Sequence, residues 1–241
     1  ISTTYAKKSA FTVELGSEII PSGDGLNLDD ADLVPYYLEK GRITGKRRKT
    51  MKKSLGAKTL AFPTPVWLVG TYDKDGKANI MTAAWAAICC SKPPSVAVSL
   101  RKATYSYGNI VTRQAFTINV PSEKHVREAD YAGMASGRNE DKFARTGFTP
   151  VKSDLVDAPY VAECPLILEC RLIHTLEIGL HTQFVGEILD VKADPEVLGE
   201  GGLPDIDKVK PIIFGPEIRT YHGIGRYLGQ AFAVGKDLDR G

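Results

Sequence analysis

Short apolar runs follow one another from Leu55 onward, with polar residues between them, and this pattern predicts a mainly β protein. Turn residues separate the runs, as in the "DKDGK" that joins the first two and predicts a β-hairpin. Because most connections are hairpin-like and few helices are expected, the pattern favours an antiparallel barrel over a parallel sheet. The expected strands cover residues 65–72, 78–85, 95–100, 116–120, 166–178 and 182–193.

Three short helices are expected between these strands. The first covers residues 104–115 and begins with Thr104 as its capping residue. The second covers residues 122–133, with Ser122 as its cap and Gly133 at its end. A brief helical turn is expected over residues 139–147.

The first 52 residues differ from the rest and predict an N-terminal arm (1–52) in front of one main domain (53–241). The arm contains apolar residues spaced for a short strand and a helix, which favours packing on the barrel or on its neighbour in a dimer. The alternative is a mobile extension that binds another protein. Its basic run before Lys53 has no interleaved aromatic residue, which favours a solvated linker over a nucleic-acid or membrane contact.

Composition narrows the class of protein. The chain has 241 residues, 25% of them charged, and a net charge of +2, so no strong field favours nucleic acid or an anionic membrane. No apolar run approaches the roughly 20 residues of a membrane span. The spacing of Cys89, Cys90, Cys164 and Cys170 matches neither a metal motif nor a disulfide framework. We expect reduced, buried thiols in a cytoplasmic protein and no metal site.

The junction after the expected strand 95–100 carries candidate binding chemistry. Its sequence "SLRKATYSYGN" combines hydroxyls and two cations with the start of a helix. A helix N-terminus offers free N–H groups and partial positive charge, so Arg101, Lys102 and Thr104 would complete a cradle for a monophosphate. The alternative is a capped helix with two solvated cations.

A second candidate feature is the end of the hairpin strand at residues 78–85. Small residues from Thr82 to Ala84 would let a flat ligand approach the backbone N–H and C=O groups. Met81 and Trp85 would supply apolar surface beside it. The alternative for Trp85 is an ordinary place in the core.

Several fragments in order resemble the flavin reductase-like, FMN-binding split-barrel family, and most closely its flavoredoxin members. They include "NIMTAAWAAICCSKPPSVAVSLRKATYSYGNI", "FTINVP", "YAGMASGRNEDKFARTGF" and "LHTQFVGEILDV", within residues 51–236. The resemblance implies a six-stranded split barrel of the Greek-key antiparallel type. It also implies a homodimer with FMN in a groove beside the subunit interface.

The resemblance also implies which residues hold the cofactor. Those expected to bind FMN are Asn79, Met81, Thr82, Ala83, Ala84, Trp85, Ser99, Leu100, Arg101, Lys102, Thr104, Lys142 and Phe143.

Two further features follow from the resemblance. His181 matches a histidine that places nicotinamide beside the flavin, which makes it the catalytic candidate; the alternative is a turn histidine that satisfies a loop carbonyl. Cys89 and Cys90 fall where flavoredoxins carry a cysteine pair, and we expect buried packing for them in preference to a redox role.

The predicted function is electron exchange through bound FMN by an oxidoreductase. The first class is an NAD(P)H-dependent flavin reductase, with NADH or NADPH as co-substrate. The alternative is an electron-transfer flavoprotein that serves a protein redox partner. A third class is a flavin-storage or interaction module without catalysis.

Overall fold

The structure is a computed structural model that describes residues 52–236 and residue 238. The chain divides into two units, Ile1–Leu55 and Gly56–Gly241. The strand and helix expected in the N-terminal arm lie outside the described residues, so the arm and its packing stay predictions. The second unit carries all the elements discussed below.

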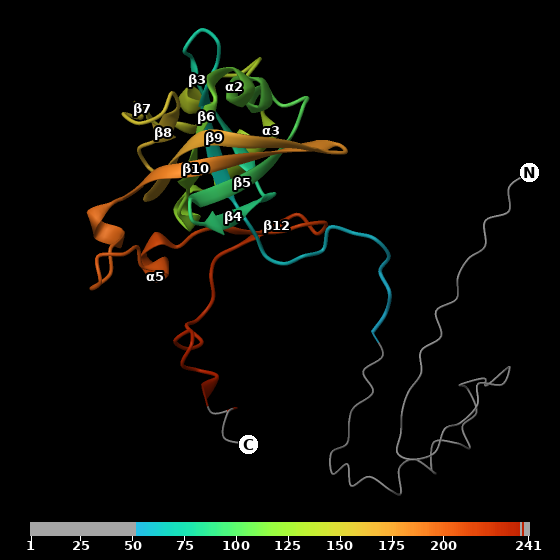
Figure 1. Cartoon of the computed structure of the whole chain (residues 1–241), viewed down its shortest axis with the longest axis vertical. Helices are drawn as coiled ribbons and strands as arrows, with labels where there is room; N and C mark the ends of the chain where they lie inside the picture. Colours follow the sequence, from blue (N-terminus) through green and yellow to red (C-terminus); the bar gives the residue numbers. More distant parts are fainter. Residues whose placement is uncertain (1–51, 237, 239–241) are drawn as a thin grey trace, which may run out of the picture. The chain divides into compact units, whose positions relative to one another are not determined.

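A seven-stranded sheet forms the body of this unit, and every neighbouring pair in it is antiparallel (Figure 1). In spatial order the strands are β3 (Ala78–Ala83), β2 (Trp67–Tyr72), β6 (Ala115–Val120), β9 (Leu166–Ile178), β10 (His181–Ala193), β5 (Pro94–Arg101) and β4 (Ala86–Ser91). The prediction of a mainly β, antiparallel barrel is confirmed.

Strand β4 is the one strand of this sheet that the sequence pattern did not predict. Among the described strands it pairs only with β5, so it extends the sheet beyond the six strands that the resemblance implied. From Ala87 onward all its residues are exposed. Because neither face of the strand is buried beyond Ala86, its sequence does not show the alternation of apolar and polar residues that predicts a strand.

The prediction that Cys89 and Cys90 are buried is wrong, because both lie exposed on β4. The pairing of β4 with β5 shifts register between Ile88 and Cys90, which places Cys89 at a bulge on a sheet edge. The other two cysteines, Cys164 and Cys170, are buried as expected. Burial raises the pKa of both their thiols.

The expected helices form, but their ends differ from the prediction. They are α2 (Tyr105–Arg113), η1 (Glu123–His125) with α3 (Val126–Met134), and α4 (Lys142–Thr146). Neither Thr104 nor Ser122 makes a side-chain capping bond, although each occupies an N-cap position. Helix α3 runs through Gly133 and ends at Met134, because Ala135 takes an extended backbone.

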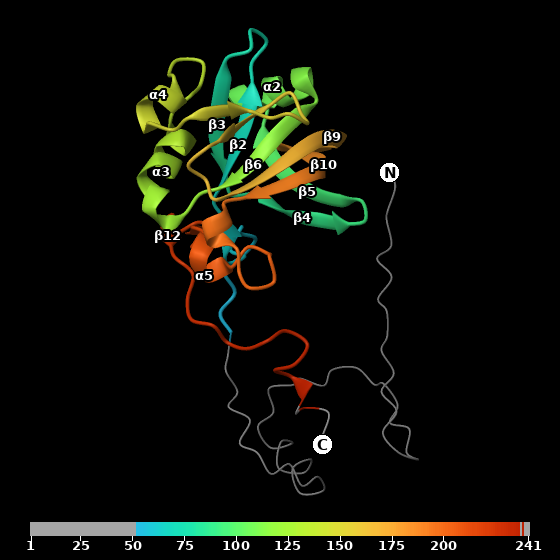
Figure 2. The same ribbon diagram turned by 90° about the vertical axis from the view of Figure 1, so that its left-hand side faces the viewer.

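Two smaller sheets, of three and of two strands, and two short helical segments complete the unit. Figure 2 shows α3 and α4 along the side of the sheet where β3 lies, and both helices contact β3. The remaining elements are β1 (Thr64–Pro65), β7 (Pro150–Lys152), β8 (Pro159–Val161), η2 (Pro195–Val197), α5 (Ile206–Val209), β11 (Ile213–Gly215) and β12 (Thr220–His222).

The apolar core has two main clusters that lie on opposite sides of the β2–β3 hairpin. One packs Leu68 and Ile80 against Ala129 and Phe143 of the helices. The other includes Phe116 and Phe184, among the largest fully buried side chains. Burial of this kind contributes about 25 cal/mol per Å² of apolar surface, so the clusters hold β3 in place from both sides.

Gly70 marks the closest packing in the sheet. A Cβ there would overlap the carbonyl oxygen of Pro159 and the hydroxyl of Thr117, and that hydroxyl already donates to the Pro159 oxygen at 2.6 Å. Neither atom is the far end of a flexible side chain. The strand therefore requires glycine at this position.

We expect Gly70→Ala to lower the free energy of unfolding by about 1–3 kcal/mol, because the backbone near Pro159 must move. Gly108 in α2 gives the matched control, since a Cβ there meets no atom within 4 Å. Alanine is favoured over glycine in a helix interior by roughly 1 kcal/mol, so Gly108→Ala should be neutral or stabilising. Denaturant titration measures both, and equal stabilities would contradict the packing.

Candidate functional site

Strand β3 borders a groove with its unpaired edge. Among the described strands it pairs only with β2, so alternate N–H and C=O groups on its other edge point away from the sheet. Two cavities of about 280 and about 210 Å³ lie here, and both are lined by Met81, Arg101 and Thr104. We call the first the loop cavity, the second the strand-end cavity, and the two together the β3 groove.

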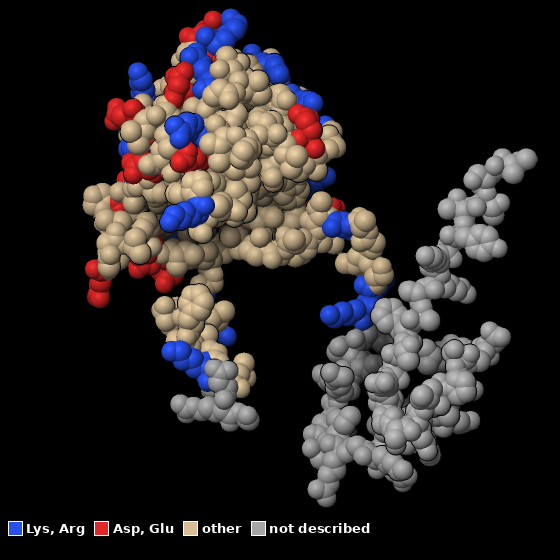
Figure 3. All heavy atoms as spheres, viewed as in Figure 1, with Lys and Arg blue, Asp and Glu red and all other residues tan. Residues whose placement is uncertain are grey.

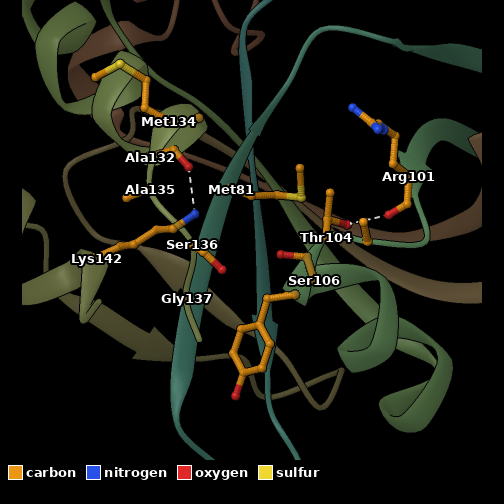
Figure 4. A pocket seen from close by; sticks show the side chains of 13 residues that line it. Met81, Arg101, Thr104, Ser106, Ala132, Met134, Ala135, Ser136, Gly137 and Lys142 are labelled. Carbon is orange, nitrogen blue, oxygen red and sulfur yellow. Dashed lines mark hydrogen bonds between the residues drawn. The ribbon is translucent and has the colours of Figure 1, made fainter. Parts of the chain in front are cut away.

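The loop cavity lies between two polar segments (Figure 4). One wall is the β5–α2 junction from Ala103 to Ser106, and the other is the end of α3 with the loop to Gly137. Figure 4 shows Met81 between the Lys142 side and the Arg101 and Thr104 side. The cavity is therefore lined by a cation on each side, Lys142 and Arg101, and by small residues such as Gly137.

Helix α2 points an uncapped N-terminus at the loop cavity. The hydroxyl of Thr104 donates to the carbonyl of Arg101 at 2.8 Å, and it accepts no capping bond from the first turn of α2. The N–H groups of that turn have no intrahelical partner, and they carry the partial positive end of the helix dipole. The guanidinium of Arg101 is exposed, and no described carboxylate lies within 4.0 Å of it. These groups form an open anion site.

The strand-end cavity is lined by residues 81–85 of the β3 end, residues 99–101 of β5, His181 and Phe214. The N–H of Ser99 donates to the carbonyl of Trp85 at 2.8 Å, which ties the end of β3 to β5. His181 starts β10 directly opposite Arg101 in the β5–β10 register. The structure thus brings the predicted catalytic histidine to the same cavity as the small-residue strand end.

Lys142 places a buried amine on the wall of the loop cavity. The residue is only 4% exposed, and its Nζ donates to the carbonyl of Ala132 at 2.7 Å. Burial lowers the pKa of this amine to about 8. An ammonium has three donors and the described residues take one, so two remain for a group in the cavity.

Three of the residues predicted to bind a cofactor do not line the groove. Asn79 is buried beneath it and donates to the hydroxyl of Ser106 at 2.9 Å, while Phe143 packs in the core. Lys102 turns away to pair with Glu177 at 2.8 Å. The other predicted residues, Met81, Thr82, Ala83, Ala84, Trp85, Ser99, Leu100, Arg101, Thr104, Lys142 and His181, all line one or both cavities.

Sequence reasoning missed the wall formed by residues 132–137 and the aromatic ring of Phe214. The one signal in the sequence was the run of small residues in "MASG", which follows the expected helix. Gly137 in this run passes so close to Asn79 that a Cβ would overlap its side-chain oxygen. Phe214 comes from β11, a strand that no pattern predicted.

Two further observations concern metals and membranes. Within residues 52–236, no group of three or more His, Cys, Asp or Glu side chains is placed to hold a metal ion. No helix in the described part of the chain is long and apolar enough to cross a bilayer.

The sequence of the barrel matches a known family. The model of the flavin reductase like domain matches residues 59–214, which is more than half of the chain. The chain belongs to the flavin reductase-like family. The predicted resemblance is confirmed, and the antiparallel body described above is the split barrel of this family.

Solved structures from the family support this assignment. The flavoredoxin of Desulfovibrio vulgaris (Miyazaki F) is 62% identical, with a TM-score of 0.74, and the match covers 77% of this chain and 100% of that one. Flavoredoxin from Methanosarcina acetivorans is 33% identical, with a TM-score of 0.72 and coverage of 79% and 99%. A relative found by sequence comparison, a high molecular weight rubredoxin of Moorella thermoacetica, is 29% identical over 152 residues, which cover 62% of this chain and 60% of that protein.

The buried amine of Lys142 predicts a pH dependence of stability. The unfolded chain keeps the ordinary lysine pKa near 10.5, whereas the folded chain has a pKa of about 8. Between these values the unfolded state binds more protons, so Lys142 contributes a rise of stability with pH of at most about 1.4 kcal/mol per unit. The buried thiols of Cys164 and Cys170, whose pKa is raised, contribute in the opposite direction in the upper part of this range.

We expect Lys142→Met to remove the lysine contribution, so that its unfolding free energy falls relative to that of the parent between pH 8 and pH 10. Lys92→Met changes an exposed lysine on the β4–β5 turn and should keep the pH dependence of the parent. The same pH dependence in Lys142→Met and in the parent would contradict the contribution of Lys142.

Proposed function

We propose that the chain binds FMN in the β3 groove and exchanges electrons through it, as an oxidoreductase. The observation that carries this proposal is the uncapped N-terminus of α2 beside Arg101, in a cavity that shares walls with the open edge of β3. A helix N-terminus with an arginine suits a phosphate monoester, and an open strand edge suits the polar rim of a flat ring. One compact donor cluster fits the single phosphate of FMN.

The residues of the groove divide into two roles under this proposal. Arg101, the hydroxyl of Thr104 and the first N–H groups of α2 would hold the phosphate. The backbone of residues 81–84 would face the ring, with Met81 and Trp85 as apolar contacts. Asn79 would act from beneath through Ser106, and Phe143 would fix the start of α4.

FMN would supply a ring that accepts a hydride or single electrons, and the protein would set its surroundings. Lys142 would keep a proton at Nζ in the loop cavity, where its positive charge would favour a ring that has gained electrons. His181 would bound the strand-end cavity beside Arg101 and help to position a nicotinamide ring.

Two electron donors or acceptors are compatible with this site. The first is NADH or NADPH, which would make the protein a flavin reductase. The second is a protein redox partner, and the names of two similar proteins, flavoredoxin and high molecular weight rubredoxin, favour it. We keep pyridine nucleotide as the leading proposal because His181 lines the strand-end cavity, beside the residues that would face the flavin ring.

Anaerobic mixing of the flavin-loaded protein with NADH or NADPH tests the choice. Rapid loss of the visible flavin absorbance would support the reductase. Reduction by dithionite and by a reduced redox protein, without reduction by either nucleotide, would support the carrier. A protein that takes up no added FMN would contradict both.

We expect Arg101→Ala to weaken FMN binding by roughly tenfold to a hundredfold, because a charge-assisted bond to phosphate contributes about 1.5–3 kcal/mol. Arg145 is the matched control, since it lines neither cavity of the groove and pairs with Glu140 at 3.4 Å. Fluorescence titration of FMN measures both variants. Equal dissociation constants would mean that the phosphate lies elsewhere.

The homodimer stays a proposal. Leu176, Ile178 and Leu180 at the β9–β10 hairpin are each at least half exposed, and a second copy would cover such apolar surface. Figure 3 shows acidic and basic side chains intermixed on one face of the molecule, so no single charge sign opposes self-association there. The mass of the chain in solution would decide it.

A further inference from the structure

A third cavity of about 300 Å³ lies beside the β3 groove and is not needed to hold FMN in it. It shares Thr82, Ala84 and Phe214 with the strand-end cavity, and it shares Gly133 and Met134 with the loop cavity. We call it the Arg219 pocket, after the arginine that lines it. A molecule in this pocket would therefore be a direct neighbour of whatever occupies the groove.

The floor of the Arg219 pocket is aromatic. The rings of Phe214 and Tyr221 have centroids 5.5 Å apart and are tilted by 46°. Val66, which is 1% exposed, adds an aliphatic contact. Aromatic walls of this kind favour a planar apolar ring as the occupant.

The rim of the pocket offers one unpaired cation. No described carboxylate lies within 4.0 Å of the guanidinium of Arg219. Its neighbour Glu217 accepts a hydrogen bond from the hydroxyl of Thr59 at 2.7 Å, which lowers the pKa of that carboxyl. Arg219 also lowers the pKa of Glu217 through its charge, but the two side chains form no ion pair within 4.0 Å, so the guanidinium donors of Arg219 are available to a ligand.

The backbone of the turn fixes where the side chain of Arg219 begins. Glu217 and Arg219 both have positive φ, at 67° and 57°, a conformation that non-glycine residues adopt at a cost. The N–H of Arg219 donates to the carbonyl of Gly215 at 2.8 Å, which closes the turn. The β11–β12 hairpin therefore fixes the backbone of this arginine beside the pocket.

The opposite side of the pocket offers an acceptor. Asp130 of α3 accepts from the hydroxyl of Tyr221 at 2.8 Å, and burial raises the pKa of that hydroxyl to about 12. The phenol therefore stays protonated and donates its hydrogen to Asp130, while the second carboxylate oxygen of Asp130 has no hydrogen-bond partner among the described residues. A ligand here would place a hydrogen-bond donor toward Asp130 and an anion toward Arg219.

We propose that the Arg219 pocket binds a single planar ring that carries an anionic group, as the direct neighbour of the molecule in the groove. This proposal rests on the proposed flavin site for its role, but not for the binding itself. The volume suits one ring with its substituents. Two sources share this chemistry: an aromatic carboxylate, and the nicotinamide half of a pyridine nucleotide with its phosphate.

Calorimetric titration of the full chain with benzoate and with benzamide tests the pocket, because the two probes differ in charge and little in shape. The parent should bind benzoate roughly tenfold or more tightly than benzamide. Arg219→Gln should lose most of this preference, and Arg219→Lys should retain part of it. Arg226→Gln changes another exposed arginine beyond β12 and should keep the full preference.

Each titration is run with and without saturating FMN, after thermal melting confirms that the variants fold. Reduced nicotinamide mononucleotide serves as a further probe in the same titrations. If this nucleotide or benzoate binds the parent more tightly than it binds Arg219→Gln, the proposal stands, and the probe that does so identifies the source of the ligand. If neither probe depends on Arg219, or if FMN displaces both, the proposal is wrong. Loss of FMN binding with the Arg219-dependent preference intact would instead refute the flavin site alone.

Discussion

The unpaired edge of β3 is the constraint on which the rest of the site depends. Backbone N–H and C=O groups require partners, and an open strand edge in a barrel needs something to cover it. Here the cover is incomplete: α3 contacts β3, with the hydroxyl of Thr82 donating to the carbonyl of Ala129, but the edge from Met81 to Ala84 still lines cavities. Under the proposed function, a flat, polar-rimmed molecule would cover this part of the edge.

The packing around β3 explains why this edge stays in place without a second strand. Gly70 lets β2 approach the Pro159 backbone, and the two core clusters hold the hairpin on both sides. Gly133 on α3 lies against Thr82, where a Cβ would stand 3.2 Å from the threonine Cβ. The helix is therefore close enough to support β3 and too close to allow another strand between them.

The sequence predicted the longer strands that are mostly buried, and it failed where a strand is exposed or very short. The apolar runs of β2, β3 and β5 are buried or half-buried over most of their length, so those strands were found within a few residues. Strand β4 is exposed from Ala87 onward, and β11 and β12 have three residues each, so neither produced a pattern. The same failure hid Phe214 and Arg219, because their place in a site depends on a hairpin that local sequence does not specify.

For the groove itself, the residue types could be read from the sequence, and the fold supplied their direction. A basic pair after a strand suggests two equivalent phosphate ligands, yet Lys102 pairs with Glu177 while Arg101 lines the cavity. Arg101 is the last residue of β5, whereas Lys102 lies in the turn that leads to α2, so the strand fixes the direction of only one of them. Conversely, Lys142 is far from Arg101 in sequence and reaches the same cavity only because α4 packs on β3. The charges that would meet a flavin are thus set by which face each element presents, and Phe214, shared by the groove and the Arg219 pocket, would couple the two occupants.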